Sequence, residues 1–204
     1  MTIGIPAVVA KYRFRAPIYF WVQDLWPESI VVAGGVKNKY VIKIVDSLTR
    51  FLYQESKKIL VQSRAFISYI KNQNVPNNKI SYLPNSTESF YKKVDLNNKY
   101  KNIMPKEGPI LMFAGNIGEA QGFNTIIKSA KFLNDSNVKV NWVILGDGRQ
   151  RESLEIKINE LGLQNNFFFL GSYPSEEMPY FFAHADAMLV TLKKSLIFSM
   201  TIPN

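Results

Sequence analysis

Two apolar runs that end in glycines decide the fold of this chain: Gly108-Pro109-Ile110-Leu111-Met112-Phe113-Ala114 leads into Gly115-Asn116-Ile117-Gly118, and Trp142-Val143-Ile144-Leu145 leads into Gly146-Asp147-Gly148. Each run is typical of a buried strand that ends in a sharp turn. In a parallel α/β sheet, such a turn lets a phosphate approach the backbone N–H groups at the start of the next helix without an intervening side chain. The pattern predicts a nucleotide or nucleotide-sugar site.

The residues around these runs alternate between strand and helix patterns. Strict alternation of this kind implies a parallel sheet with right-handed crossovers. The expected strands are 109–114, 139–145, 166–170 and 186–191, and the expected helices are 122–133, 149–161 and 175–184.

The first half of the chain predicts a second α/β sheet. Residues 17–22 are apolar and uncharged, as in a strand that is buried on both faces. Residues 40–54 place Val41, Ile44, Val45, Leu48, Phe51 and Leu52 on one helical stripe beside a basic flank. The other expected elements are a helix that ends near 11–15, a strand at 57–62, a helix from an N-cap at Ser63 to about Lys71, and a strand at 79–83.

Residues 92–107 are polar and nearly aperiodic, which is typical of a connection between domains. The predicted fold class is therefore α/β, with two Rossmann-like parallel-sheet domains, both incomplete. The expected boundaries are 1–95 for the N-terminal domain, 96–107 for the linker and 108–204 for the C-terminal domain. The chain opens within an apparent helix and stops without a closing element, so we expect a fragment that is truncated at both ends.

Composition excludes several kinds of site. The chain has 204 residues with 47% hydrophobic content and no cysteine, which excludes disulfides, thiolate catalysis and cysteine-bound metals. His184 is the only histidine, so no site can use several. The net charge of +9 favours anionic partners, although a solvated basic surface is the alternative. No apolar stretch approaches the roughly 20 residues that span a bilayer, so we expect no membrane crossing. The absence of cysteine favours a reducing compartment, and we expect a cytoplasmic protein.

Four motifs together resemble those of a known family. They are Gln23-Asp24-Leu25-Trp26-Pro27-Glu28-Ser29, Phe113-Ala114-Gly115-Asn116-Ile117-Gly118, Ile144-Leu145-Gly146-Asp147-Gly148 and Phe169-Leu170-Gly171-Ser172-Tyr173-Pro174. In order and spacing the chain is similar to retaining GT-B glycosyltransferases of family four, group 1, which build bacterial surface polysaccharides. The resemblance implies transfer of a sugar from a nucleotide diphosphate to an acceptor that is often lipid-linked. It also implies a further helix beyond Pro203 with two glutamates seven residues apart.

The resemblance assigns a donor site to the second domain. Many relatives supply an arginine and a lysine in the loop after the first glycine turn, and this chain has neither. The diphosphate charge would instead meet the helix dipole, side-chain amides, or the lysines at 193 and 194. The candidate donor-binding residues are Gly115, Asn116, Ile117, Gly118, Gln121, Gly146, Asp147, Gly148, Tyr173 and Lys193.

Each donor-site side chain has a plainer alternative. Asp147 precedes a predicted helix and so has the position of a helix cap. Tyr173 is expected either to stack on the base or to pack against the protein surface. The lysines at 193 and 194 are expected either to meet phosphate or to end a solvated strand.

The candidate catalytic residues are Asp24 and Glu28. Asp24 follows the strand at 17–22 and is expected at its carboxyl end, where ligands of open α/β sheets bind. Either carboxyl could orient the acceptor hydroxyl or act as a base, and the alternative is that both cap a turn before Pro27. No cofactor is expected beyond the nucleotide-sugar donor substrate, and no metal, because the chain has no Asp-X-Asp motif.

The first half of the chain also predicts peripheral contact with an anionic membrane. Trp26 and nearby cations would present a polyprenyl-linked glycan acceptor from the inner face of the cell membrane. The cations are Lys11, Arg13, Arg15, Lys37, Lys39 and Lys43.

Other functions remain open from the residues alone. A nucleotide-sugar epimerase of the same fold would need more acids and histidines. A basic nucleotide- or nucleic-acid-binding α/β protein without catalysis has only the charge in its favour, so no nucleic-acid partner is expected. A truncated protein without activity is the last alternative.

Overall fold

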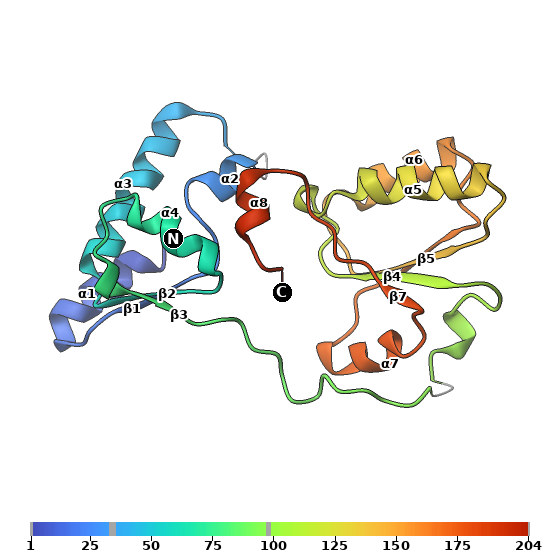
Figure 1. Ribbon diagram of the computed structural model, residues 1–204, viewed down its shortest axis with the longest axis horizontal. Coiled ribbons are helices and arrows are strands. Elements are labelled where there is room, and N and C mark those ends of the chain that lie inside the picture. Colours follow the sequence, from blue (N-terminus) through green and yellow to red (C-terminus); the bar gives the residue numbers. More distant parts are fainter. Residues whose placement is uncertain (1, 33–35, 97–98, 204) are drawn as a thin grey trace. The chain divides into compact units, whose positions relative to one another are not determined.

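The computed structural model describes residues 2–32, 36–96 and 99–203, and it divides into two compact units. Unit 1 comprises residues Met1–Ser86 together with Lys194–Asn204, and unit 2 comprises Thr87–Lys193. Each unit contains its own parallel sheet (Figure 1). The predicted α/β class with two parallel sheets is confirmed.

Unit 1 is built on a three-stranded parallel sheet with the strand order β1-β2-β3. The predicted elements are confirmed, including the side chain of Ser63, which caps α4 by accepting a hydrogen bond from the N–H of Ala65. The elements are α1 (Gly4–Phe14), β1 (Tyr19–Val22), α2 (Glu28–Val32), α3 (Lys39–Glu55), β2 (Lys58–Val61), α4 (Arg64–Lys71), a 3-10 turn (Asn77–Lys79), β3 (Ile80–Tyr82) and α8 (Leu196–Met200).

The core of unit 1 lies on one face of this sheet. Ile59 and Val61 of β2 are completely buried there, and Phe66 of α4 packs over them. Tyr53 of α3 joins the same cluster and contacts Phe20 of β1 with ring centroids 5.9 Å apart. Helices α3 and α4 therefore cover the same side of the sheet (Figure 1).

The opposite face of β1 is open, which corrects the prediction of a strand buried on both faces. Tyr19 is 55% exposed and Trp21 is 42% exposed, whereas Val22 is buried. Because side chains alternate along a strand, Tyr19 and Trp21 point away from the core that Phe20 and Val22 enter.

The apolar stripe of α3 is also only partly buried. Leu52 is buried, but Val41, Ile44 and Phe51 are 41%, 68% and 42% exposed. Neighbouring elements cover the side of α3 that carries Thr49, Leu52 and Tyr53. The helix itself is confirmed, and its outer side carries exposed apolar residues.

Unit 2 is built on a four-stranded parallel sheet with the strand order β6-β5-β4-β7. Its elements agree closely with the prediction, except that the expected strand at 186–191 forms only two paired residues. The elements are a 3-10 turn (Lys101–Ile103), β4 (Ile110–Ala114), η3 (Glu119–Gln121), α5 (Phe123–Asp135), β5 (Asn141–Leu145), α6 (Arg151–Glu160), β6 (Phe167–Gly171), a 3-10 turn (Ser175–Glu177), α7 (Met178–Phe182) and β7 (Ala187–Met188).

The sheet of unit 2 is covered on both faces. All five residues of β5 are buried. Ile144 joins a cluster with residues of α5 and α6, and its neighbour Val143 joins a second cluster with Phe181 of α7. Figure 1 shows α5 and α6 on one side of the strands and α7 on the other. Continuous apolar runs are expected of strands that are buried in this way.

The two units divide the chain differently from the predicted domain boundaries. Tyr100 and Met104 fall within the predicted 96–107 linker, yet both are buried in the core of unit 2. Ile197 falls within the predicted 108–204 domain, yet it is buried in the core of unit 1. These few buried apolar residues lie in stretches that are otherwise polar or lack a clear pattern, so the sequence pattern does not predict their burial.

Candidate functional site

The two glycine turns of unit 2 lie against each other at the carboxyl ends of β4 and β5. The strands are parallel neighbours with Ala114 opposite Leu145, so both turns begin at the same level. The N–H of Gly115 donates to Leu145 O at 2.9 Å, and the N–H of Ile117 donates to Asp147 O at 2.8 Å. The turns therefore form one hydrogen-bonded unit at the edge where open α/β sheets bind ligands.

Contact between the turns explains why glycine is needed at two positions. At Gly146, φ is +120°, and a Cβ atom would lie 1.9 Å from the carbonyl oxygen of Gly115. At Gly148, a Cβ atom would lie 2.4 Å from the carbonyl oxygen of Ile117. Backbone atoms cannot move aside as a flexible side chain can, so the packing of one turn on the other excludes any side chain here.

The chain itself already uses three of the four amides that were predicted to bind phosphate. Gly115 and Ile117 donate to the neighbouring turn, and Gly118 donates to Asn116 O at 3.0 Å. Among the described residues, the backbone N–H groups of Asn116 and Asp147 have no acceptor. The remaining amide donors are therefore one from each turn, together with the first-turn amides of α5.

Side-chain amides surround the same place. A Cβ atom at Gly118 would lie 2.6 Å from Nδ2 of Asn116 and 2.9 Å from Oε1 of Gln121. A Cβ atom at Gly148 would lie 2.7 Å from Oδ1 of Asn116, so this side chain spans both turns. Oε1 of Gln121 is buried and has no hydrogen-bond partner among the described residues. The structure thus brings Asn116 and Gln121 together over Gly118, next to the two turns.

The side chain of Asp147 makes two local contacts. Its Oδ1 accepts a hydrogen bond from the N–H of Gly148 at 2.7 Å, and its Oδ2 lies 3.9 Å from a guanidinium nitrogen of Arg151 in the first turn of α6. The N-cap of α6 is Gln150 and makes no side-chain cap hydrogen bond among the described residues, so Asp147 interacts with the start of the helix only through the charge of Arg151.

Tyr173 packs into the protein rather than standing free to stack on a base. Its ring centroid lies 4.5 Å from that of Phe181 and 5.8 Å from that of Tyr100, within the core cluster beside α7. The packed alternative is therefore favoured for this side chain.

Lys193 lies beside the loop that follows the first glycine turn. Its backbone N–H donates to Ala120 O at 2.7 Å, and its Nζ forms an ion pair with Glu119. Sequence reasoning had assigned no role to Glu119. The pair joins residues 74 positions apart, so no local pattern could have found it.

In unit 1, the two predicted catalytic carboxyls have different surroundings. Asp24 lies two residues beyond the end of β1 with its side chain exposed, but nearby chain partly desolvates the carboxyl and raises its pKa. Glu28 begins α2, and its carboxylate is one of the groups that raise the pKa of the Tyr69 hydroxyl on α4. Its Oε2 is buried and has no hydrogen-bond partner among the described residues. The interaction of Glu28 with Tyr69 of α4 favours a structural role, while Asp24 lies at the position expected of a ligand contact.

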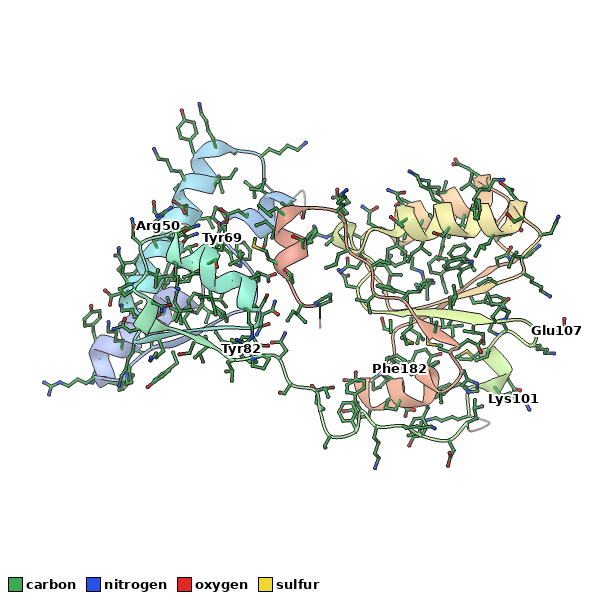
Figure 2. All side chains as sticks on the ribbon, in the orientation of Figure 1. Arg50, Tyr69, Tyr82, Lys101, Glu107 and Phe182 are labelled. Carbon is green, nitrogen blue, oxygen red and sulfur yellow. The ribbon has the colours of Figure 1, made fainter. Side chains whose placement is uncertain are left out.

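The charge near Glu28 is partly balanced. Arg50 of α3 has electrostatic interactions with both Glu28 and Tyr69, and Figure 2 shows Arg50 and Tyr69 close together. Burial is the main cause that raises the pKa of the Tyr69 hydroxyl, followed by its interaction with Glu28. This cluster is a polar contact between helices.

A further polar residue marks the carboxyl end of β2. Gln62 is 1% exposed, and its Nε2 donates to Gln23 O at 3.3 Å. Its Oε1 has no partner among the described residues. Its signal in the sequence is a polar residue directly after the apolar strand residues Leu60 and Val61.

Among the described residues, we find no cluster of three or more histidine, aspartate or glutamate side chains that could hold a metal ion, and no helix with the length and apolar content of a membrane span.

Comparisons with known proteins agree with this architecture. The model of the family "Glycosyl transferases group 1" matches residues 95–195. The 2-deoxystreptamine glucosyltransferase of Streptomyces kanamyceticus is 27% identical over 107 residues, which are 52% of this chain and 28% of that protein. An uncharacterized glycosyltransferase of Methanocaldococcus jannaschii is 30% identical over 161 residues, which are 76% of this chain and 36% of that protein.

Solved structures share the fold. HepE from Anabaena, in complex with UDP-glucose, superposes with a TM-score of 0.75 at 16% identity, over 94% of this chain and 51% of that one. The chain thus spans between 28% and 51% of the length of these relatives. From the family match and the two parallel sheets, we conclude that the chain has the GT-B fold and belongs to the group 1 glycosyl transferases.

Proposed function

We propose that this chain acts in the transfer of a sugar from a nucleoside diphosphate to a glycan acceptor, with retention of the anomeric configuration. The observation that carries this proposal is the pair of contacting glycine turns, in which the amides of Asn116 and Asp147 have no acceptor among the described residues at the carboxyl edge of the sheet. Donors from adjacent turns and from the start of a helix suit a diphosphate. The relative HepE was solved with UDP-glucose, which supports a uridine nucleotide as the first ligand to test.

In the proposed reaction, the acceptor hydroxyl oxygen forms a bond to the anomeric carbon of the donor sugar. The bond from that carbon to the β-phosphate oxygen breaks, and the diphosphate leaves with the electron pair. The acceptor proton passes to the leaving phosphate. The amides of the two turns and the N-terminus of α5 stabilise the charge that develops on that phosphate.

Asp24 is the residue that we assign to the acceptor hydroxyl. Its exposed carboxyl follows β1 at the carboxyl edge of the unit 1 sheet, and a carboxylate accepts hydrogen bonds from hydroxyl groups. Its raised pKa reflects desolvation, which also strengthens its hydrogen bonds to a bound hydroxyl.

Isothermal titration calorimetry with UDP, GDP and UDP-N-acetylhexosamines tests the donor site. We expect heat of binding with at least one nucleotide and its loss in Gly146→Ala, because that substitution forces the two turns apart. Gly171→Ala is the matched control, since it also places a side chain at positive φ but meets no atom within 4 Å. Absence of binding with every nucleotide contradicts the proposal.

For the acceptor, we propose a lipid-linked glycan reached by peripheral contact with an anionic membrane. The outer side of α3 carries Tyr40 and Ile44, each 68% exposed, and the cations Lys39 and Lys43 lie on the same helix. Exposed apolar residues flanked by cations are typical of helices that lie at an anionic bilayer surface. Trp26 is half-buried, so it contributes less than the sequence predicts.

Co-sedimentation with vesicles tests this contact. We expect binding to vesicles that contain phosphatidylglycerol, weaker binding to phosphatidylcholine alone, and a loss with Ile44→Ser. The matched control is Phe132→Ser, which removes a 70% exposed apolar side chain from α5 of unit 2. An equal loss in both variants contradicts a membrane surface on α3.

A further inference from the structure

The loop after the first glycine turn is fastened to the segment 191–193. The N–H of Lys193 donates to Ala120 O at 2.7 Å, and the hydroxyl of Thr191 donates to Gln121 O at 2.6 Å. Two hydrogen bonds to neighbouring carbonyls of one loop fix the segment in register with it. The base of the Lys193 side chain is therefore held next to the proposed phosphate site.

Gly122 makes this close approach possible. Its φ is +63°, and a Cβ atom there would lie 3.2 Å from the carbonyl carbon of Leu192 and 3.2 Å from the nitrogen of Lys193. Both neighbours are backbone atoms, so the contact leaves little room for adjustment. The main chain of Lys193 thus has a defined place beside the start of α5.

The ammonium group of Lys193 has an anionic partner within the same loop. Its Nζ pairs with Oε1 of Glu119, and the two side chains are 36% and 47% exposed. Ion pairs with this much exposure are weak, because water competes for both charges. A phosphate group carries more negative charge than a carboxylate and offers more acceptor oxygens, so it can displace Glu119 from the ammonium.

We propose that Glu119 is an internal competitor of the donor phosphate, which holds Lys193 while the site is empty and gives it up when a nucleoside diphosphate binds. The inference rests on the proposed function, because it places the phosphate at the glycine turns beside this loop. It assigns Lys193 as the cation that replaces the arginine and lysine missing from the loop. It also implies that Glu119 weakens the binding of the released nucleotide by recapturing Lys193.

The test is titration calorimetry of the 204-residue chain with UDP, using Glu119→Gln and Lys193→Met. Glu119→Gln keeps the shape of the side chain and its oxygen acceptor but removes the charge. We expect it to bind UDP about fivefold more tightly, as for the removal of one exposed charge competitor. Lys193→Met keeps the aliphatic stem and the backbone contacts, and we expect about tenfold weaker binding from the loss of one charge-assisted hydrogen bond.

Two controls separate exchange on Lys193 from other effects. Glu107→Gln removes the same charge from an 84% exposed side chain elsewhere in unit 2, and we expect no change in UDP affinity. Uridine, which has no phosphate, should bind the parent chain and Glu119→Gln equally. In the Lys193→Met background, the effect of Glu119→Gln should shrink, because the two residues act through one interaction.

The outcomes separate this inference from the proposed function. If the parent chain binds UDP and Glu119→Gln leaves the affinity unchanged or weakens it, the inference is wrong and the nucleotide site stands. The inference also fails if Glu107→Gln tightens binding as much, or if uridine shows the same gain. If neither the parent chain nor Glu119→Gln binds UDP, both proposals fall.

Discussion

The sharpest consequence of the structure concerns Gly146, where a single methyl group should disrupt the contact between the two turns. In Gly146→Ala, the new Cβ would lie 1.9 Å from Gly115 O, whereas real Cβ atoms stay beyond 3.0 Å. The turns must separate, which breaks the hydrogen bonds from Gly115 to Leu145 and from Gly146 to Gly171. Each bond contributes about 1 kcal/mol net, and the strained φ adds about 1–2 kcal/mol. We therefore expect the free energy of unfolding of unit 2 to fall by about 3–4 kcal/mol.

Gly171→Ala measures the strain without the collision. Its φ is +79° and no atom lies within 4 Å of the new Cβ, so the expected loss is only about 1–2 kcal/mol. Denaturant unfolding should be followed by amide hydrogen exchange of peptides from 108–171, because that reads unit 2 separately from unit 1. An equal decrease in the free energy of unfolding in Gly146→Ala and Gly171→Ala would refute the reasoning, because the contact between the turns would then contribute nothing to stability.

Substitutions at three further positions test individual interactions by denaturant unfolding at several pH values. Burial raises the pKa of Asp24 above 3.8, because the folded protein disfavours the charged carboxylate. The contribution of this carboxyl to the free energy of unfolding is therefore fully present at low pH, and it is lost as pH rises through the folded pKa. Asp24→Asn should therefore have a higher free energy of unfolding than the parent at pH 7 and the same value near pH 3. A lower free energy of unfolding than the parent at pH 7 would contradict this. The pKa of Glu177 is lowered below 4.5, first of all by its hydrogen bond from Lys99. The stability that the ionised carboxylate contributes is therefore present above pH 4.5 and is lost as pH falls through the folded pKa. Glu177→Gln should flatten the acid side of the stability profile, and an unchanged profile would argue against the Lys99 pair. Ser63→Ala should cost about 1 kcal/mol at every pH because the cap of α4 is lost, and Ser63→Asn should recover most of it.

Much of unit 2 could be predicted because its signals are local. The strand predicted at 109–114 is observed as Ile110–Ala114, and the helix predicted at 149–161 is observed as Arg151–Glu160. Apolar runs bounded by glycine turns specify such elements without reference to distant residues. The short β7 shows the limit, because only Ala187 and Met188 pair with β4 although the apolar pattern continues.

Burial on the second face of a strand could not be predicted in the same way. The run 17–22 has the composition of a doubly buried strand, but Tyr19 and Trp21 face solvent. Composition describes the strand alone, whereas burial depends on which other elements cover it. The same reason explains why Ile44 lies on the exposed side of α3 despite fitting its apolar stripe.

In the candidate site, the sequence located the turns but not the atoms that remain available. Gly115 and Ile117 were expected to present their amides to a ligand, and both donate instead to residues of the second turn. Each of them donates to a carbonyl about 30 residues away in the sequence, at the end of β5 or in the turn that follows it, which no local motif can reveal. The pairing of Glu119 with Lys193 was missed for the same reason.

The contacts between the turns explain why glycine is required at positions 146 and 148. Gly146 and Gly148 are required first because each faces the backbone of the other turn at less than 3.0 Å from a would-be Cβ. Hydrogen bonds between and within the turns and to Gly171 use the other amides of the turns, and among the described residues they leave one from each turn, at Asn116 and Asp147. Because the turns are bonded to each other, these two donors are held in a fixed relation before any ligand arrives. Such preorganisation lowers the cost of binding an anion, so the packing of the turns and the proposed phosphate site are two consequences of the same glycines.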